Sequence, residues 1–249
     1  MNTRKMMKVG AVSAAAVCAA AGSASADMVM ARGSSSSGLD ATVMFQAVGS
    51  DLYITLKNTS LSDVLVPSDL LTGVFFDITG DSLELAAQGA VLDAESIVRW
   101  GSSEPDGSVG GEWAFRGGLS GAPGGAAYGI STAGFGLFGP HDSFPGANLD
   151  GQNGPQGMNY GLLSLGDDPL TGNAPVTGGN ALIQSGVVFH LSGLPAGFDP
   201  GRIANVSVQY GTSLSQPSFV TPITSVPAPG GLVAMAISGA LVARRRRRA

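Results

Sequence analysis

The chain has 249 residues, a formal net charge of −5, 38 glycines and a single cysteine. This length is enough for one well-cored domain, and one cysteine excludes an intramolecular disulfide or a metal site built from several thiolates. Three basic residues lie among the first eight and five among the last six, so the part between them has five basic and eighteen acidic residues, a formal charge of −13. Such a surface excludes nucleic-acid binding, and it repels anionic polysaccharide unless divalent cations bridge the two.

The N-terminus has the three parts of a secretory signal peptide, residues 1–26. Its basic residues are Arg4, Lys5 and Lys8. An apolar run from Val9 to Ala21 follows, and the small residues Ala24 and Ala26 then mark a cleavage site that would leave Asp27 as the new N-terminus. A lipoprotein signal at Cys18 is the alternative, disfavoured because the preceding residues lack the expected leucine. Cleavage after Ala26 removes the only cysteine.

The body, residues 27–224, is predicted to be all-β. Apolar residues recur in short runs separated by turn-forming clusters, and these runs predict strands near 40–45, 52–57, 71–78, 83–92, 111–116, 127–131, 160–164, 186–191 and 203–210. Ser96 to Trp100 is expected to form a turn of helix. Short antiparallel strands with glycine-rich turns predict a β-sandwich, and the pattern leaves jelly-roll and immunoglobulin-like topologies open.

Two consecutive phenylalanines stand out in the strand predicted from Leu71 to Ile78. Phe75 and Phe76 must point to opposite faces of that strand, so only one can face the interior of a sandwich. The other face therefore also needs a cover, for which the glycine-rich loops are the candidate. We interpret both rings, together with Trp113 and Phe115, as core side chains rather than ligand-stacking platforms.

The stretch from Gly117 to Gly179 is rich in glycine, proline, asparagine and aspartate, which is typical of long loops. Within it, Asn148, Asp150 and Asn153 offer carboxylate and amide oxygens separated by glycines, as a calcium site requires. The spacing lacks the regular ligand pattern of known calcium loops, so an Asx-rich turn is the favoured interpretation. Asp167-Asp168 is a second weak candidate, more consistent with a solvated turn before Pro169.

The sequence predicts no catalytic residues, and we expect the protein not to be an enzyme. His141 lies in a Gly-Pro-His-Asp loop, and His190 lies in a strand-like run, where a lone histidine is usually a turn or surface residue. Serine-hydrolase elbows, zinc-protease histidine pairs, phosphate-binding loops and dinucleotide fingerprints are all missing from the sequence.

The C-terminal 25 residues, 225–249, carry the most informative pattern. Val226 precedes a Pro227-Ala228-Pro229 box, and an apolar run follows from Leu232 to Ala243. The five arginines after it are Arg244, Arg245, Arg246, Arg247 and Arg248. Arginines behind an apolar segment resist translocation and stay cytoplasmic. The predicted transmembrane helix is short, about 18 Å against a hydrocarbon core of about 30 Å, which favours a temporary membrane handle.

This order resembles the PEP-CTERM sorting signal of Gram-negative bacteria, with Ala228 in place of the usual glutamate. The resemblance implies signal peptidase and the secretion machinery as partners, an inner-membrane-anchored precursor, and cleavage near Pro227 by an exosortase-like membrane protease. It also implies delivery to the cell surface or extracellular matrix. The alternative is a plain C-terminal membrane anchor.

Four segments of the body resemble a family of exosortase-dependent surface proteins of undefined activity: Leu71–Ile78, Gly110–Arg116, Tyr128–Ser131 and Gln209–Thr212. The resemblance implies a β-rich exported protein and supplies no site residues. Two function classes remain open: a structural protein of the surface or biofilm matrix, and an adhesion module that binds glycan, such as exopolysaccharide, or another cell, with calcium as an optional cofactor. The sequence has only two tryptophans, Trp100 and Trp113. This low number favours the first class, because sugar platforms generally need exposed aromatic faces.

Overall fold

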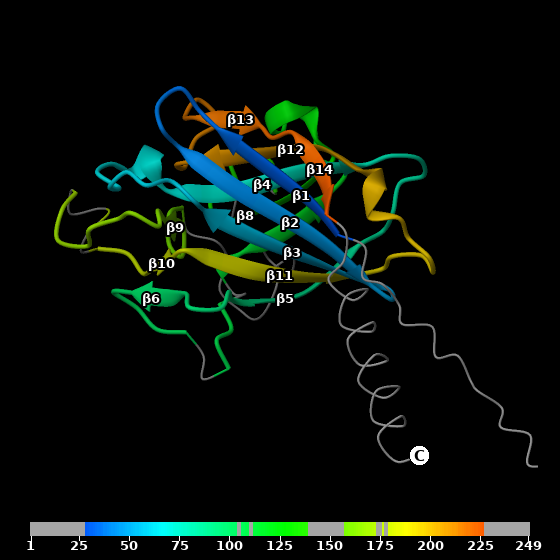
Figure 1. The fold of residues 1–249 in the computed structure, drawn as a ribbon, viewed down its shortest axis with the longest axis horizontal. Helices are drawn as coiled ribbons and strands as arrows, with labels where there is room; N and C mark the ends of the chain where they lie inside the picture. The colour runs from blue at the N-terminus through cyan, green and yellow to red at the C-terminus, as the bar shows by residue number, and fades with distance from the viewer. Residues whose placement is uncertain are drawn as a thin grey trace, which may run out of the picture.

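The protein folds into β-strands that curl around a common core (Figure 1). The structure is a computed structural model that describes residues 28–103, 106–109, 112–138, 157–172, 176 and 179–226. Short 3₁₀ turns lie at Pro67–Asp69, Pro123–Gly125 and Pro200–Arg202. Within the described ranges the strands are β1 (Met28–Ser34), β2 (Asp40–Val48), β3 (Asp51–Asn58), β4 (Leu71–Ile78), β5 (Ala86–Leu92), β6 (Ile97–Arg99), β7 (Ala114–Gly117), β8 (Tyr128–Ser131), β9 (Leu162–Leu163), β10 (Leu182–Gln184), β11 (Gly186–Ser192), β12 (Ile203–Tyr210), β13 (Ser218–Val220) and β14 (Ile223–Val226).

The strands form two sheets. The first has the order β14-β1-β2-β3-β11-β5, and each of its neighbouring pairs is antiparallel. The second has the order β13-β12-β4-β9-β10-β6, with β8 pairing to β4 and β7 pairing to β8. The second sheet is mixed, because β9 and β10 run parallel. The all-β prediction is confirmed, and the parallel pair is a departure from a purely antiparallel architecture.

Strand β2 shows why these residues form sheet. Ala41, Val43 and Phe45 are buried, while the residues between them are partly exposed, which is the period-two pattern of a strand with one face on a core. The core lies between the two sheets: the Phe45 ring meets the Phe76 ring of β4 edge-on, with ring centroids 5.2 Å apart. Trp113 packs similarly against Phe189 of β11, with centroids 4.8 Å apart.

Strand β4 is buried on both faces, as the consecutive phenylalanines predicted. Phe76 belongs to the core between the sheets, and Phe75 belongs to a second apolar cluster on the opposite face. Both rings have no exposed surface. The second cluster is covered by residues of the glycine-rich segment, namely Leu119, Ala122, Ala126, Phe135, Leu137 and Phe138. Part of that segment is therefore a packed cover over β4.

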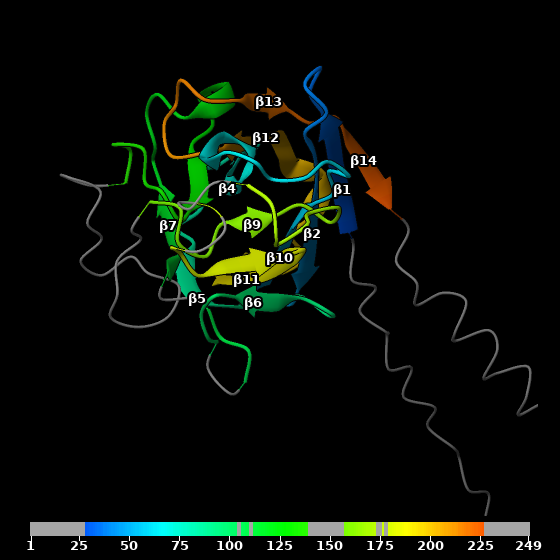
Figure 2. The ribbon, with the colours of Figure 1, turned by 90° about the vertical axis from the view of Figure 1, so that its left-hand side faces the viewer.

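The chain passes between the sheets several times, and some of these passages join edge strands of the two sheets (Figure 2). On one side, Thr221 and Pro222 connect edge strand β13 of the second sheet to edge strand β14 of the first. On the other side, β5 continues into β6 and β10 continues into β11. We call this second side the seam.

Most predicted strands are confirmed, and one local prediction is wrong. Ser96 to Trp100 contains strand β6 rather than a turn of helix, and β6 pairs with β10, Arg99 opposite Leu182. The β-branched Ile97 and Val98 favour a strand, and the available sheet edge decides the outcome. Strand β5 begins at Ala86, later than predicted, and β9 is limited to two residues.

Candidate functional site

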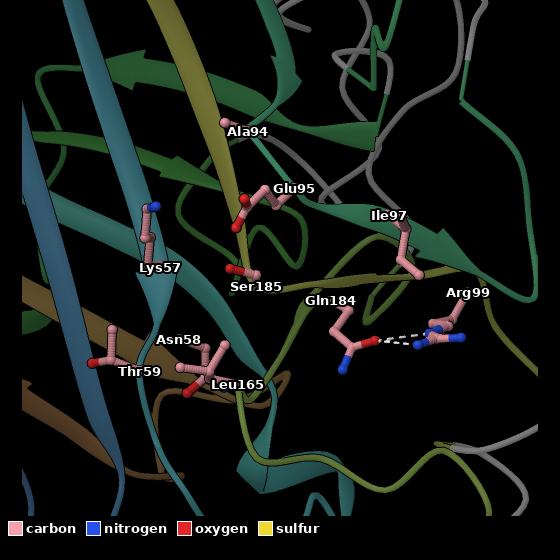
Figure 3. Close-up of a pocket in the computed structure, with 10 residues that line it drawn as sticks. All are labelled: Lys57, Asn58, Thr59, Ala94, Glu95, Ile97, Arg99, Leu165, Gln184 and Ser185. Atoms are coloured by element: carbon pink, nitrogen blue, oxygen red, sulfur yellow. Dashed lines mark hydrogen bonds between the residues drawn. The ribbon is translucent and has the colours of Figure 1, made fainter.

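A pocket of about 490 Å³ opens at the seam, and we call it the seam pocket (Figure 3). It lies beside two connections between the sheets: the one from β5 of the first sheet to β6 of the second, and the one from β10 of the second sheet to β11 of the first. Four separate segments supply its lining: Lys57, Asn58 and Thr59; Ala94, Glu95, Ile97 and Arg99; Leu165; and Gln184 and Ser185. Its volume lies within the range of about 300–1,000 Å³ typical of small-molecule sites.

Backbone hydrogen bonds hold the walls of the seam pocket together. The Asn58 amide donates to the Ser185 carbonyl at 3.1 Å, which joins the end of β3 to the β10–β11 junction. The Asp93 amide donates to the Gly186 carbonyl at 3.1 Å, and the Gly186 amide donates to the Ser96 hydroxyl at 3.0 Å. The two chain crossings are thus tied to each other, and the pocket has a fixed frame.

The pocket contains two of the five basic residues of the predicted body. Lys57 forms an ion pair with Asp93. Arg99 lies along the wall, and its Nε donates to the Gln184 side-chain oxygen at 2.8 Å, with a second bond from Nη2 (Figure 3). Because Gln184 is neutral, this pair orients the guanidinium without cancelling its charge. Glu95, which is exposed, adds a carboxylate to the same lining.

The two tryptophans have different environments. Trp113 is fully buried in the main core, as predicted. Trp100 follows Arg99 directly in the chain, and 41% of its surface is exposed. An exposed indole therefore lies one residue from a side chain that lines the seam pocket.

A separate group of carboxylates joins two loops beyond the ends of β3 and β9. The Val64 amide donates to Asp167 Oδ1 at 3.0 Å, and the Asp168 amide donates to Asp63 Oδ1 at 3.1 Å. Burial raises the pKa of Asp167 to about 6, with the neighbouring Asp63 adding to the shift. A hydrogen bond from Thr171 lowers the pKa of Asp63. Asp167-Asp168 is thus part of a loop-to-loop contact rather than an isolated solvated turn.

His190 lies on β11 and is half-buried. Its Nε2 lies 3.0 Å from Asp51 Oδ1, and its ring stacks on Tyr53 of β3 with centroids 4.7 Å apart. His190 and Tyr53 are directly opposite in the β3–β11 register. Because all three residues belong to this strand pair, the arrangement is a cross-strand contact that supports the pairing of β3 with β11.

Most residues predicted to carry function lie outside the described residues. These are the signal cleavage residues Ala24, Ala26 and Asp27, the calcium candidates Asn148, Asp150 and Asn153, the loop residue His141, and the sorting residues from Pro227 to Arg248. Val226 is described, and it is the last residue of β14.

Two kinds of feature are absent from the described part of the chain. It holds no group of three or more His, Cys, Asp or Glu side chains arranged to bind a metal ion. Its helical segments include none that is both long and apolar enough to cross a bilayer.

Comparison of the chain with protein-family models, with curated proteins and with solved structures gives no match.

The seam pocket is the feature that sequence reasoning missed. Its residues come from four segments far apart in the chain, and none of them belongs to a recognisable motif. The sequence offers one indication of the pocket: the body has few basic residues, and two of them, Lys57 and Arg99, line it.

Proposed function

We propose that this is an exported, non-enzymatic protein of the bacterial surface or extracellular matrix, sorted by cleavage of its tail by an exosortase-like protease near Pro227. The signal peptide, the Pro box, the short apolar run and the arginine block support this proposal. The single structural observation that supports it best is the pairing of Met28 with Val226 between β1 and β14.

That pairing gives the sorting proposal a physical basis. Strand β1 begins two residues after Ala26, and β14 ends one residue before Pro227. Both predicted cleavage sites therefore lie just outside one antiparallel strand pair. Removing the signal peptide and the tail leaves the paired backbone groups of β1 and β14 intact, so processing at either end does not require the sheet to open.

The finer description of the body as a β-sandwich belongs to the same proposal. Its support is the shared apolar core, in which side chains from the inner faces of both sheets interdigitate, as Phe45 and Phe76 do. A displayed body of this kind serves as a structural unit of the surface, and its acidic charge keeps neighbouring copies apart.

Mass spectrometry of the C-terminus of surface-isolated protein tests the sorting proposal. We expect the mature chain to end near Pro227 and to lack the arginine block. Replacing Pro227 and Pro229 with alanine should leave an uncleaved precursor in the inner membrane. Replacing Arg244 to Arg248 with serine should instead release the chain with its tail intact, since each central charge costs about 2.5–3.5 kcal/mol to insert.

The matched control is Arg32→Ser, because Arg32 is a largely exposed basic residue of β1 far from the tail in sequence. This variant should be processed like the wild type. Surface protein that still ends in the arginine run would identify the tail as a plain anchor and overturn the proposal.

A further inference from the structure

Two residues of the seam pocket hold a backbone conformation that suits glycine. Glu95 has φ of 69° and Ser185 has φ of 88°, both in the left-handed region that side chains disfavour. Glycine occupies fifteen described positions of positive φ, and the other described residues of positive φ are Trp100, Phe135, Tyr160 and Asn205. Backbone strain of this kind clusters at binding sites, and two of the six strained side chains line this one pocket.

The turn that carries Glu95 makes this point sharply. The Ser96 amide donates to the Asp93 carbonyl at 3.0 Å, so residues 93–96 form a β-turn with Glu95 at its third position. A positive φ at that position defines a type II turn, for which glycine or asparagine is preferred. Glutamate is therefore a disfavoured residue at this position of the turn. Its carboxylate lies in the lining of the seam pocket.

The polar lining combines hydrogen-bond acceptors with donors. Glu95 contributes a carboxylate, which only accepts, and Ser185 contributes a hydroxyl. Lys57 has three ammonium protons with one side-chain partner, Asp93, and Arg99 has five N–H groups of which Nε and Nη2 bond Gln184. A sugar hydroxyl both donates and accepts, so a vicinal diol is satisfied by a carboxylate and a basic group that line the same pocket.

Part of the lining is apolar and exposed. Ile97 is 45% exposed and Leu165 is 58% exposed, and both belong to the same pocket. Aliphatic surface of this kind suits the C–H face of a pyranose ring, whose edge carries the hydroxyls. Trp100, the next residue in the chain after Arg99, is exposed but is not one of the lining residues.

From these observations we propose that the seam pocket binds a neutral sugar unit of a glycan. Neutral rather than acidic sugar follows from charge, because the predicted body carries a formal charge of −13, and Asp93 and Glu95 balance the two basic side chains of the pocket, Lys57 and Arg99. This binding activity is independent of how the chain is sorted.

Saturation-transfer NMR on the full chain in detergent tests this proposal. The probes are maltotriose, cellotriose, mannotriose and chitotriose, with trigalacturonate as the acidic counterpart. We expect at least one neutral trisaccharide to bind and trigalacturonate to bind more weakly. Glu95→Gly and Ser185→Gly should each weaken that binding at least about tenfold, since each removes a hydrogen-bonding side chain.

The same two variants carry an opposite expectation for stability. Because glycine relieves the strain of positive φ, Glu95→Gly and Ser185→Gly should melt at the wild-type temperature or above it. Loss of binding in a variant of equal or greater stability cannot be attributed to misfolding. The matched control is Glu84→Gln, because Glu84 is exposed and precedes β5, whereas Glu95 follows that strand.

Three results would overturn the proposal. The first is no binding of any neutral trisaccharide at millimolar concentration. The second is binding that Glu95→Gly and Ser185→Gly leave unchanged, which would place the sugar elsewhere. The third is tighter binding of trigalacturonate than of every neutral probe, which would reverse the charge argument. None of these outcomes bears on the C-terminus found by mass spectrometry, so the two proposals fail separately.

Discussion

Truncating the two phenylalanines of β4 separately should produce two different kinds of damage. Phe76 packs between the sheets against Phe45 and Tyr128, with ring centroids 5.2 and 5.5 Å away. Phe75 packs on the other face against Phe135 and Phe138, with centroids 6.1 and 6.4 Å away. Both rings are completely buried, so each change to alanine leaves a large cavity.

The expected cost of Phe76→Ala is about 3–5 kcal/mol in the free energy of unfolding. A domain of ordinary stability has about 5–15 kcal/mol, so this variant should be close to global unfolding. Phe75→Ala removes a similar ring, but most of its cluster partners lie on the covering stretches that flank β8, residues 119–126 and 135–138. Those stretches can open while β8 stays paired with β4 and the two sheets remain packed, so part of the loss should appear as local opening.

Urea denaturation measures the global cost, and hydrogen exchange separates the two modes. In Phe75→Ala we expect faster exchange of the cover amides, such as the Leu119 amide that donates to the Ala127 carbonyl at 2.9 Å, with β2 and β3 still protected. In Phe76→Ala, protection should fall across both sheets. Leu170→Ala is the control, because Leu170 is 93% exposed and its truncation should cost little.

Two results would refute this reasoning. If Phe75→Ala leaves the exchange of the cover unchanged, the cover is not held by that ring. If both phenylalanine variants keep wild-type stability, the two-faced burial of β4 is wrong.

Two further predictions concern pH and calcium. Burial raises the pKa of Asp167 from 3.8 to about 6, so the folded chain retains a proton there that the unfolded chain releases. The melting temperature should therefore rise as the pH falls from about 7 to about 5, and Asp167→Asn should remove that rise. Asp63 has a lowered pKa, so its protonation lowers the melting temperature, but only at pH values below 3.8. A calcium site at Asn148–Asn153 predicts that millimolar calcium, but not magnesium, raises the melting temperature, and that Asp150→Ala abolishes the effect. An unchanged melting temperature in calcium would remove the site.

The fold class was predictable because strand periodicity is a local property. Leu71–Ile78 and Ile203–Tyr210 match β4 and β12 to the residue, since each is a long run of β-branched and aromatic side chains between turn signals. Strands β10 and β13 have three residues each, too few for a periodic pattern. They exist because a neighbouring edge offers free backbone groups, which only the assembled sheet can show.

The second apolar cluster was predictable in outline for a different reason. Two adjacent aromatic rings on one strand cannot share a face, so a cover had to exist. Which residues supply it could not be predicted, because the segment from Gly117 to Phe138 is dominated by glycine and has little hydrophobic periodicity. The apolar side chains of the cover lie outside β8, and they are anchored by the Phe75 ring and not by a strand of their own.

The seam pocket lay beyond sequence reasoning because it depends on two chain crossings meeting. Glu95 follows β5 and Ser185 precedes β11, and these strands become neighbours only in the folded sheet. The positive φ of both residues is likewise a property of the folded backbone. In the sequence, Glu95 and Ser185 are ordinary polar residues, and nothing in the pattern around them predicts their backbone conformation.

Backbone strain and close packing both bear on where this chain has glycine. Where close packing needs a missing side chain, this protein has glycine: a Cβ on Gly129 would lie 2.6 Å from the Phe75 ring, so β8 can pass beneath that ring only without one. Positive φ is held by six described residues other than glycine, and two of them, Glu95 and Ser185, line this one pocket. Each of the two costs stability, and the proposed binding through the Glu95 carboxylate and the Ser185 hydroxyl would offset that cost.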